Sequence, residues 1–330
     1  MSSSVTCAAA QRAAAARRSP GPSGPGERWP SVTAIVATRD RRELLERAVR
    51  SILAQDYPGR LECLVVYDQC EPDPHLVLAS QEARTVRAIR NRRTAGLAGA
   101  RNQGALAASG DLLAFCDDDD EWLPGKLRRQ VRALQDRPDS VAVSCANVVR
   151  YAGRDIPRRA PRLAVGHRDL LRSRVAVIHS STILVRRPQF LGEVGMIDEA
   201  IPGGASEDYE WQLRAARQGP ILVVDEPLAR IHWHDGSMFA RQWRLYIAGL
   251  RYVLRKNPEF RTEPRGLSRI LGQIAYAYAA LGERRECLRA VRRCLAADWR
   301  QPRAYLSLLV ICGLSAETPL RILHRSGRGI

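Results

Sequence analysis

The sequence predicts an α/β protein in which helices flank a mostly parallel sheet and a helical appendage follows at the C-terminus. Up to about residue 240, short apolar runs alternate with stretches of helical periodicity, which is typical of βαβ units. Polar residues follow several of these runs, and beyond residue 240 the periodicity is helical only. The chain has 330 residues, 45% of them hydrophobic and 26% charged, enough for one large domain with an appendage.

The elements can be assigned in chain order from their periodicity. Residues 1–30 are rich in Ser, Ala, Arg, Pro and Gly without an apolar core, so we expect a disordered tail. Buried, often β-branched runs predict strands at 32–37, 61–67, 112–116, 141–149, 175–185 and 221–225. Apolar residues at helical spacing predict helices at 44–53, 96–109, 126–134 and 207–218. The α/β domain thus covers 31–240, and a helical region covers 241–330.

Within the helical region, residues 267–281 and 284–297 pair around Gly282 as a helical hairpin, similar to one tetratricopeptide-like unit. No apolar run approaches the roughly 18 residues that a membrane-spanning helix needs. The eight cysteines include no C-x-x-C pair, which argues against a zinc ribbon and a disulfide framework. We therefore expect a cytoplasmic protein, with peripheral contact at the inner face of the membrane as an open alternative.

The net charge of +17 comes almost entirely from arginine, since Lys126 and Lys256 are the two lysines among 52 basic residues. The arginines are spread along the chain and form no stripe, which makes nucleic acid an unlikely partner. A positive field attracts anionic substrates such as nucleotide diphosphates, or acidic lipid headgroups.

Five adjacent acids at 117–121 follow the strand expected at 112–116. Neighbouring carboxylates repel one another, and a unit pair about 4 Å apart costs roughly 1 kcal/mol in water. A divalent cation would relieve this repulsion, and carboxylate oxygens suit Mg²⁺ or Mn²⁺. The alternative is that these acids only stabilise the N-terminus of the helix that begins near Pro124. The carboxyl end of a parallel strand is where ligands bind, which favours the ligand site.

Residues 91–104 offer backbone N–H groups at a glycine-bearing helix start and a guanidinium, both of which suit a diphosphate. Gly96, Gly99 and Gly104 match neither a G-x-x-x-x-G-K-[ST] loop nor the dinucleotide spacing. Tight packing of the helix on the sheet is the alternative reason for these small residues.

Glu207 and Asp208 begin an expected helix behind Ser206, and two interpretations are open. They either cap that helix or supply a general base that takes a proton from an acceptor hydroxyl. His232 and His234 follow an expected strand, and each is either a metal ligand or a solvated surface residue.

Taken in order, the polar segments resemble the family-two inverting glycosyltransferases of the GT-A fold, whose sheet is Rossmann-like. The resemblance covers about residues 31–240 and is carried by the motifs at 38–41 (TRDR), 55–58 (QDYP), 96–104, 115–122 (FCDDDDEW), 195–199 (GMIDE), 207–211 (EDYEW) and 234–237 (HDGS). It implies that 31–240 is a catalytic domain with a nucleotide-diphosphate sugar donor and a hydroxyl acceptor (a glycan, a lipid-linked or a small molecule). It also implies Mn²⁺ or Mg²⁺ at a D-x-D motif and single displacement with inversion at the anomeric carbon.

The same resemblance implies individual roles. Asp208 matches the general base, supported by Glu207. Asp117 and Asp119 match the D-x-D and would hold the metal, with His234 near them. The residues implied to bind the nucleotide sugar are Thr38, Asp40, Asp68, Arg101, Asn102, Asp117, Asp118 and Trp211.

One position departs from the family. Relatives often read Asp-Asp-Gly-Ser where this chain has Tyr67, Asp68, Gln69 and Cys70, so a nucleoside-contacting acid is missing and the base stays open. Two other functions compete with the transferase. A nucleotidyltransferase on a similar sheet would have no need of Asp208, and a basic interaction protein with a degenerate site would bind no nucleotide. The sequence indicates neither the sugar, the acceptor nor the oligomeric state.

Overall fold

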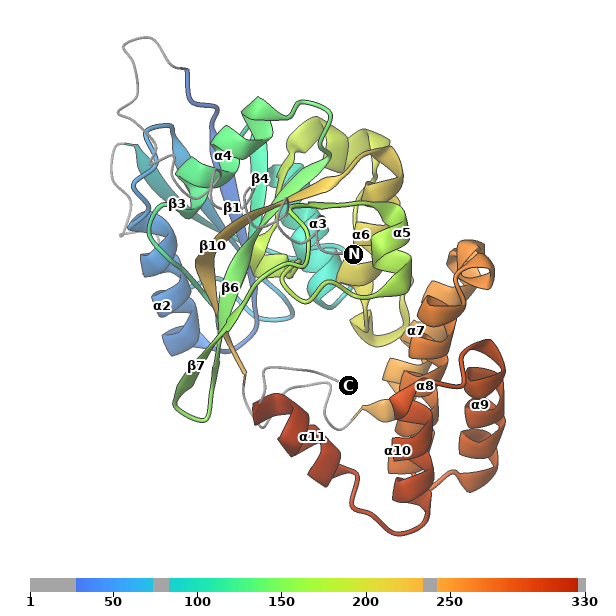
Figure 1. Ribbon diagram of the computed structural model, residues 1–330. Coiled ribbons are helices and arrows are strands. Elements are labelled where there is room, and N and C mark those ends of the chain that lie inside the picture. The colour runs from blue at the N-terminus through green and yellow to red at the C-terminus, as the bar shows by residue number, and fades with distance from the viewer. Residues whose placement is uncertain (1–27, 74–82, 234–241, 326–330) are drawn as a thin grey trace.

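The computed structural model describes residues 28–73, 83–233 and 242–325, and its centre is one mixed sheet (Figure 1). The strands are β1 (Val32–Thr38), β2 (Leu61–Tyr67), β3 (Arg84–Arg90), β4 (Leu112–Asp117), β5 (Glu121–Trp122), β6 (Ala142–Tyr151), β7 (Arg154–Arg158), β8 (Ala164–Val165), β9 (Leu184–Arg186) and β10 (Ile221–His232). Their order is β3-β2-β1-β4-β9-β6-β10-β5, with β7 beside β6 and β8 beside β10. The neighbours among β1 to β4 are parallel, as are β6 and β10, whereas β9 runs antiparallel between β4 and β6. The predicted fold class is confirmed.

Helices cover both faces of the sheet. They are α2 (Arg42–Leu53), α3 (Leu97–Ala107), α4 (Lys126–Asp136), α5 (His167–Arg172), α6 (Glu207–Gln218), α7 (Trp243–Lys256), α8 (Pro264–Ala280), α9 (Arg284–Ala297), α10 (Pro302–Ile311) and α11 (Glu317–Arg325). Alternate residues of β1 explain the two layers, because Ala34 belongs to the apolar cluster that includes residues of α2 and α4, while Ile35 belongs to the cluster that includes residues of α3 and α6. Both cores are made of apolar side chains, so the sheet is buried on both faces, as parallel sheets are.

The register of the parallel strands brings their polar ends together. Thr38 at the end of β1 is paired with Tyr67 on β2, and Ala37 is paired with Asp117 on β4. The residues that follow these strands therefore lie at one edge of the sheet, where the sequence analysis places the site.

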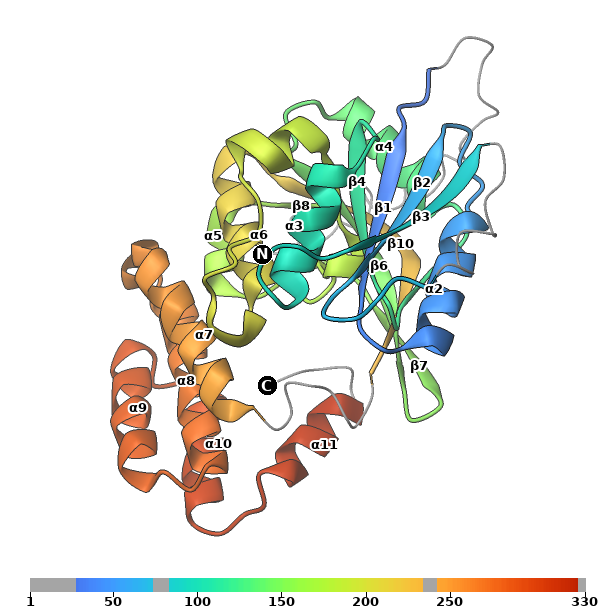
Figure 2. The same ribbon diagram turned by 180° about the vertical axis from the view of Figure 1, so that it is seen from behind.

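Helices α7 to α10 form a bundle beside the sheet, and α11 lies apart from the bundle (Figures 1 and 2). The predicted hairpin is confirmed as α8 and α9, with Gly282 between them at φ +73°, a left-handed conformation that favours glycine. The bundle meets the α/β layers closely at Gly266, where a Cβ atom would lie 1.9 Å from the carbonyl oxygen of Leu171. No helix within the described ranges is long and apolar enough to cross a bilayer. The division of the chain at residue 240 stays a prediction.

Three local expectations need correction. The prediction of a strand at 175–185 is wrong. The chain turns through a short 3₁₀ helix at Ser180–Thr182, and the strand in this region is the short β9. Thr182 Oγ1 accepts from the N–H of His179 at 2.9 Å, and such side-chain bonds compete with extended structure. The strand predicted at 221–225 is too short, because β10 continues past residue 225. Its pairing with β6 shifts register around Pro227, and proline is typical of a turn. Strand β3 was not predicted, because arginines interrupt its apolar residues at the sheet edge.

The predicted tail at 1–30 overlaps the described residues at its end. There the ring of Trp29 packs edge-on against Tyr57, with ring centroids 5.4 Å apart. The carbonyl oxygen of Pro30 accepts a hydrogen bond from the Tyr57 hydroxyl. These two residues are therefore part of the fold, and they are held by Tyr57 of the motif at 55–58.

Candidate active site

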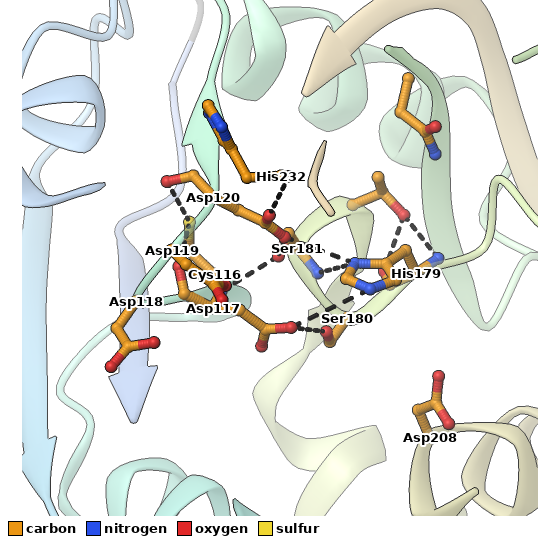
Figure 3. Close-up of polar contacts among 12 residues, drawn as sticks. Cys116, Asp117, Asp118, Asp119, Asp120, His179, Ser180, Ser181, Asp208 and His232 are labelled. Carbon is orange, nitrogen blue, oxygen red and sulfur yellow. Dashed lines mark hydrogen bonds and ion pairs between the residues drawn. The ribbon is translucent and has the colours of Figure 1, made fainter. Parts of the chain in front are cut away.

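The carboxylate of Asp117, the last residue of β4, is held from two sides, and Figure 3 shows the side of Ser180. Arg101 Nη2 on α3 donates to its Oδ1 at 2.6 Å, and Ser180 Oγ donates to its Oδ2 at 2.8 Å. Burial alone would raise the pKa of Asp117, but the charge of Arg101 and the hydrogen bonds from Arg101 and Ser180 outweigh burial and lower the pKa. Asp117 is therefore an ionised group at the carboxyl end of a central strand.

Arg101 also connects Asp117 to the start of α6. Its Nη1 donates to Glu207 Oε1 at 2.8 Å, and both side chains are buried. The adjacent Asp208 side chain is 16% exposed, and its Oδ2 lies 2.5 Å from Arg174 Nη2. Burial and the charge of Asp208 raise the pKa of Glu207 to about 7. Burial would also raise the pKa of Asp208, but Arg174 and other cations outweigh it and lower the pKa. Asp208 is thus the ionised and accessible carboxylate of the pair.

His179 joins Asp117 and Asp120 in a group that could hold a metal ion. One ligand atom from each of the three lies within 4.8 Å of the others. His179 Nδ1 is 3.7 Å from Asp120 Oδ2, and its Nε2 is 4.0 Å from Asp117 Oδ2. Burial lowers the pKa of His179, which favours the neutral imidazole that binds metals. Two carboxylates and an imidazole suit Mn²⁺.

Asp118 and Asp119 lie on the side of β1. Thr38 Oγ1 donates to Asp118 Oδ2 at 2.7 Å. Arg41 Nη1 lies 3.3 Å from Asp118 Oδ1 and 3.1 Å from Asp119 Oδ2, so that one cation serves both carboxylates. Burial raises the pKa of Asp118 to about 6, whereas the Asp119 side chain is more exposed, at 21%.

Asp68 contacts the N-terminus of α3, which the sequence predicted as a binding site for a diphosphate. The backbone N–H of Gly96 donates to Asp68 Oδ2 at 3.0 Å, and Asn91 Nδ2 donates to Oδ1 at 2.8 Å. Gly96 has a φ of +113°, which favours glycine at this point. The N–H of Gly96 therefore already contacts a carboxylate of the protein. Asp40, which follows β1, is exposed and has a φ of +50°.

Two of the residues expected to bind the nucleotide sugar have protein partners in the interior. Asn102 Nδ2 donates to the carbonyl oxygen of Ile197 at 2.8 Å and to Glu199 Oε1 at 2.7 Å, which fixes the motif at 195–199. The Trp211 indole is 4% exposed, and its Nε1 donates to the carbonyl oxygen of Gly195 at 3.0 Å. Both residues hold the same loop against the core.

Of the two histidines at 232–235, the structure describes His232 only. His232 Nε2 lies 2.7 Å from Glu121 Oε1, and the backbone N–H of His232 donates to Asp120 Oδ1 at 2.9 Å. His234, expected near the metal, lies outside the described residues. His179 and Arg174 are not among the predicted site residues. The available signal for His179 was the polar run at 179–182 inside an apolar stretch, which indicates a turn.

Comparison with known proteins identifies a family for the first part of the chain. Residues 33–191 match the family description "Glycosyl transferase family 2". These residues belong to glycosyl transferase family 2. The chain is also 37% identical over 227 residues to a succinoglycan biosynthesis protein, ExoO, of Rhizobium meliloti, covering 64% of this chain and 63% of that protein. It is 26% identical over 221 residues to a putative teichuronic acid biosynthesis glycosyltransferase, TuaG, of Bacillus subtilis, covering 65% and 84% of the two chains. The aligned region thus spans less than two thirds of ExoO.

The fold of this chain is similar to those of solved proteins that bind nucleotide sugars. The structure of S. aureus TarS 1-349 in complex with UDP-GlcNAc matches 90% of this chain and 92% of its own, with a TM-score of 0.63 and 15% identity. A mannosyltransferase from Pyrobaculum calidifontis in complex with GDP-Man and Mn²⁺ matches 97% and 90%, with a TM-score of 0.57 and 20% identity. These matches extend past residue 240, so the likeness in fold includes helices of the C-terminal bundle.

Proposed function

We propose that this protein is a metal-dependent, inverting glycosyltransferase that moves a sugar from a nucleotide-diphosphate donor to an acceptor hydroxyl. The observation that carries the proposal is the chain of contacts from Asp117 through Arg101 to Glu207, with Asp208 beside it. This chain joins a D-x-D motif at a strand end to an accessible carboxylate on a neighbouring helix. Membership of family 2 and the GT-A likeness support the reaction class.

Asp208 is the proposed general base. A base must be deprotonated to accept a proton, and the cations around Asp208 keep its pKa low. In the proposed step the acceptor oxygen attacks the anomeric carbon and the bond to the diphosphate oxygen breaks. The hydroxyl proton passes to Asp208, and the nucleoside diphosphate leaves. Arg174 holds the carboxylate in place from the side of Oδ2. Glu207 supports Asp208 by fixing the start of α6 to Arg101.

The carboxylates of the D-x-D fit a divalent cation. We propose Asp117 and Asp119 as its ligands, because Asp119 is the more exposed of the acids that share Arg41. Asp120 and His179 form a competing set with Asp117, and its ligand atoms lie close together. Mn²⁺ or Mg²⁺ bound there would neutralise the charge that develops on a leaving diphosphate. His234 remains a proposed neighbour of the metal.

Electron paramagnetic resonance titration of Mn²⁺ separates the two ligand sets without measuring activity. With a nucleoside diphosphate present, we expect Asp119→Asn to weaken Mn²⁺ binding at least about tenfold, since loss of even a supporting contact commonly costs that much. His179→Asn should change it less than threefold, and Asp136→Asn, a change at an exposed residue of α4, should leave it unaltered. If His179→Asn weakens Mn²⁺ binding more than Asp119→Asn does, the metal belongs to the set formed by Asp117, Asp120 and His179.

The donor is proposed as a nucleotide sugar, since the TarS and Pyrobaculum structures contain UDP-GlcNAc and GDP-Man. Thr38, Asp40, Asp68 and Asp118 surround the carboxyl ends of β1 and β2 and are the proposed nucleotide contacts. For Arg101, Asn102 and Trp211 we propose an indirect role, because Arg101 holds Asp117 and the other two hold the loop at 195–199. A cytoplasmic location, with contact at the inner face of the membrane, and a hydroxyl acceptor complete the proposal.

A further inference from the structure

A groove lies in the C-terminal bundle, away from the strand ends. It has a volume of about 580 Å³ and runs between α7, α8 and α9. Arginines from two helices line it: Arg251, Arg255, Arg289, Arg292 and Arg293. All five are exposed, so their charges face the solvent at the mouth of the groove.

The charge of this groove is not balanced by the protein. Its one acidic lining residue, Glu286, pairs with Arg289 at 2.6 Å. In the part of the chain that the structure describes, Arg251, Arg255, Arg292 and Arg293 form no salt bridge with a carboxylate. Arg251 instead lies over the ring of Tyr278, 5.5 Å from its centroid. Four guanidinium groups that have no carboxylate partner among the described residues surround one groove, which favours an anionic ligand.

The floor of the groove is apolar, and this feature decides between kinds of anion. Leu254, Leu271 and Ile274 form it together with Tyr278. A free phosphate would use the arginines alone and would make no contact with this apolar floor. Leu288 adds a further apolar group, because it is 50% exposed and lies one helical turn before Arg292 on the same face of α9. A basic helix with exposed apolar residues is typical of a surface that binds anionic lipid.

We propose that the groove between α7, α8 and α9 binds the headgroup of an anionic phospholipid and thereby holds the protein on a membrane surface. The arginines contact the phosphate, and the apolar floor takes the first part of an acyl chain. Leu288 inserts beside it at the interface. The inference does not depend on the transferase reaction, since none of these residues belongs to the candidate active site.

Vesicle flotation with the full chain tests this proposal. We compare vesicles of phosphatidylcholine alone with vesicles that also contain phosphatidylglycerol. The protein should bind the anionic vesicles and float little with the neutral ones. Arg292→Gln combined with Arg293→Gln should lower the partition coefficient about 30-fold, because each basic residue near an anionic surface contributes about 1 kcal/mol. Leu288→Gln should lower binding as well, without any change of charge.

A matched control separates the groove from the overall charge. Arg50→Gln combined with Arg60→Gln also removes two positive charges, but at exposed positions on α2 and before β2. This control should bind anionic vesicles within about threefold of the unchanged protein. The proposal is overturned if the control loses as much as the groove variant, or if both kinds of vesicle bind equally. It is also overturned if inorganic phosphate raises the Tm through Arg292 and Arg293 while no vesicle binds, which would assign the groove to a small anion.

Discussion

Arg101 and Glu207 form a buried ion pair, with Nη1 2.8 Å from Oε1 and side chains that are 5% and 7% exposed. The same guanidinium binds Asp117, so α3 ties the end of β4 to the start of α6. Removing Arg101 leaves the ionised carboxylate of Asp117 without its cation, and an uncompensated buried charge costs about 3–5 kcal/mol. We therefore expect Arg101→Gln to lower the free energy of unfolding by about 3 kcal/mol in urea denaturation at neutral pH.

Arg137→Gln is the control for that experiment, because its pair with Asp139 is exposed on both sides. Exposed pairs contribute at most about 1 kcal/mol, so this variant should stay near the unchanged protein. A similar small loss for Arg101→Gln would show that the buried bridge does not hold the site together.

Asp208→Asn should abolish most of the transfer reaction. The amide keeps the shape of the side chain but accepts no proton, and general base catalysis typically contributes about 10²–10⁴-fold. We expect kcat to fall at least about 100-fold while the Kd of the donor, measured by calorimetry, stays within threefold. Asp136→Asn, at an exposed position on α4, should change neither value. Retention of kcat by Asp208→Asn would remove Asp208 from the role of base.

Arg174 should set the pH at which the base loses its activity. Its guanidinium lies against Asp208 and outweighs burial to lower the pKa of that carboxyl group. Without this cation the pKa of Asp208 rises, so the carboxylate becomes protonated at a higher pH. We expect Arg174→Gln to move the acidic limb of the kcat profile to higher pH, with kcat recovering at alkaline pH. A profile lowered uniformly at all pH values would contradict this relationship.

Trp211 should matter for stability rather than for donor binding. Its indole is buried, packs at 5.6 Å from the ring of Phe190 and donates to Gly195. Replacing a buried tryptophan with alanine typically costs about 3–5 kcal/mol, because it leaves a cavity. We expect Trp211→Ala to lose stability in this range and, while folded, to bind the donor with an unchanged Kd. Loss of donor binding at full stability would restore the direct contact that the sequence suggested.

The fold was largely predictable because its elements carry strong local signals. Residues 61–67 are a short apolar run, and 207–218 have helical spacing closed by Gly219; both elements have the predicted bounds. The turn at His179 was missed because the polar run at 179–182 is short and stands inside an apolar stretch, so it was included in the strand although Thr182 bonds back to His179. Strand β3 was missed because its residues are mostly polar and pair at the sheet edge through their backbone.

The sequence indicated where in the fold the site lies, but it did not indicate which side chains pair with one another there. Asp117 and Asp68 could be placed at one edge because parallel strands end together. The pairing of Arg101 with Asp117 and Glu207 depends on how α3 packs between β4 and α6, and no spacing in the sequence shows this. The same holds for Arg174 and Asp208, which lie 34 positions apart in the chain.

The most direct test of the account is a thermal-shift panel of UDP, GDP, dTDP and their sugars, each with and without Mn²⁺. The account predicts that one nucleotide raises the Tm by a few degrees, because a ligand at about 100 times its Kd stabilises the folded state by about 2.7 kcal/mol. The shift should require Mn²⁺ and should disappear in Asp117→Asn, while Asp136→Asn keeps it. No shift with any nucleotide under either condition would contradict the proposed transferase and leave a protein whose site no longer binds a nucleotide sugar.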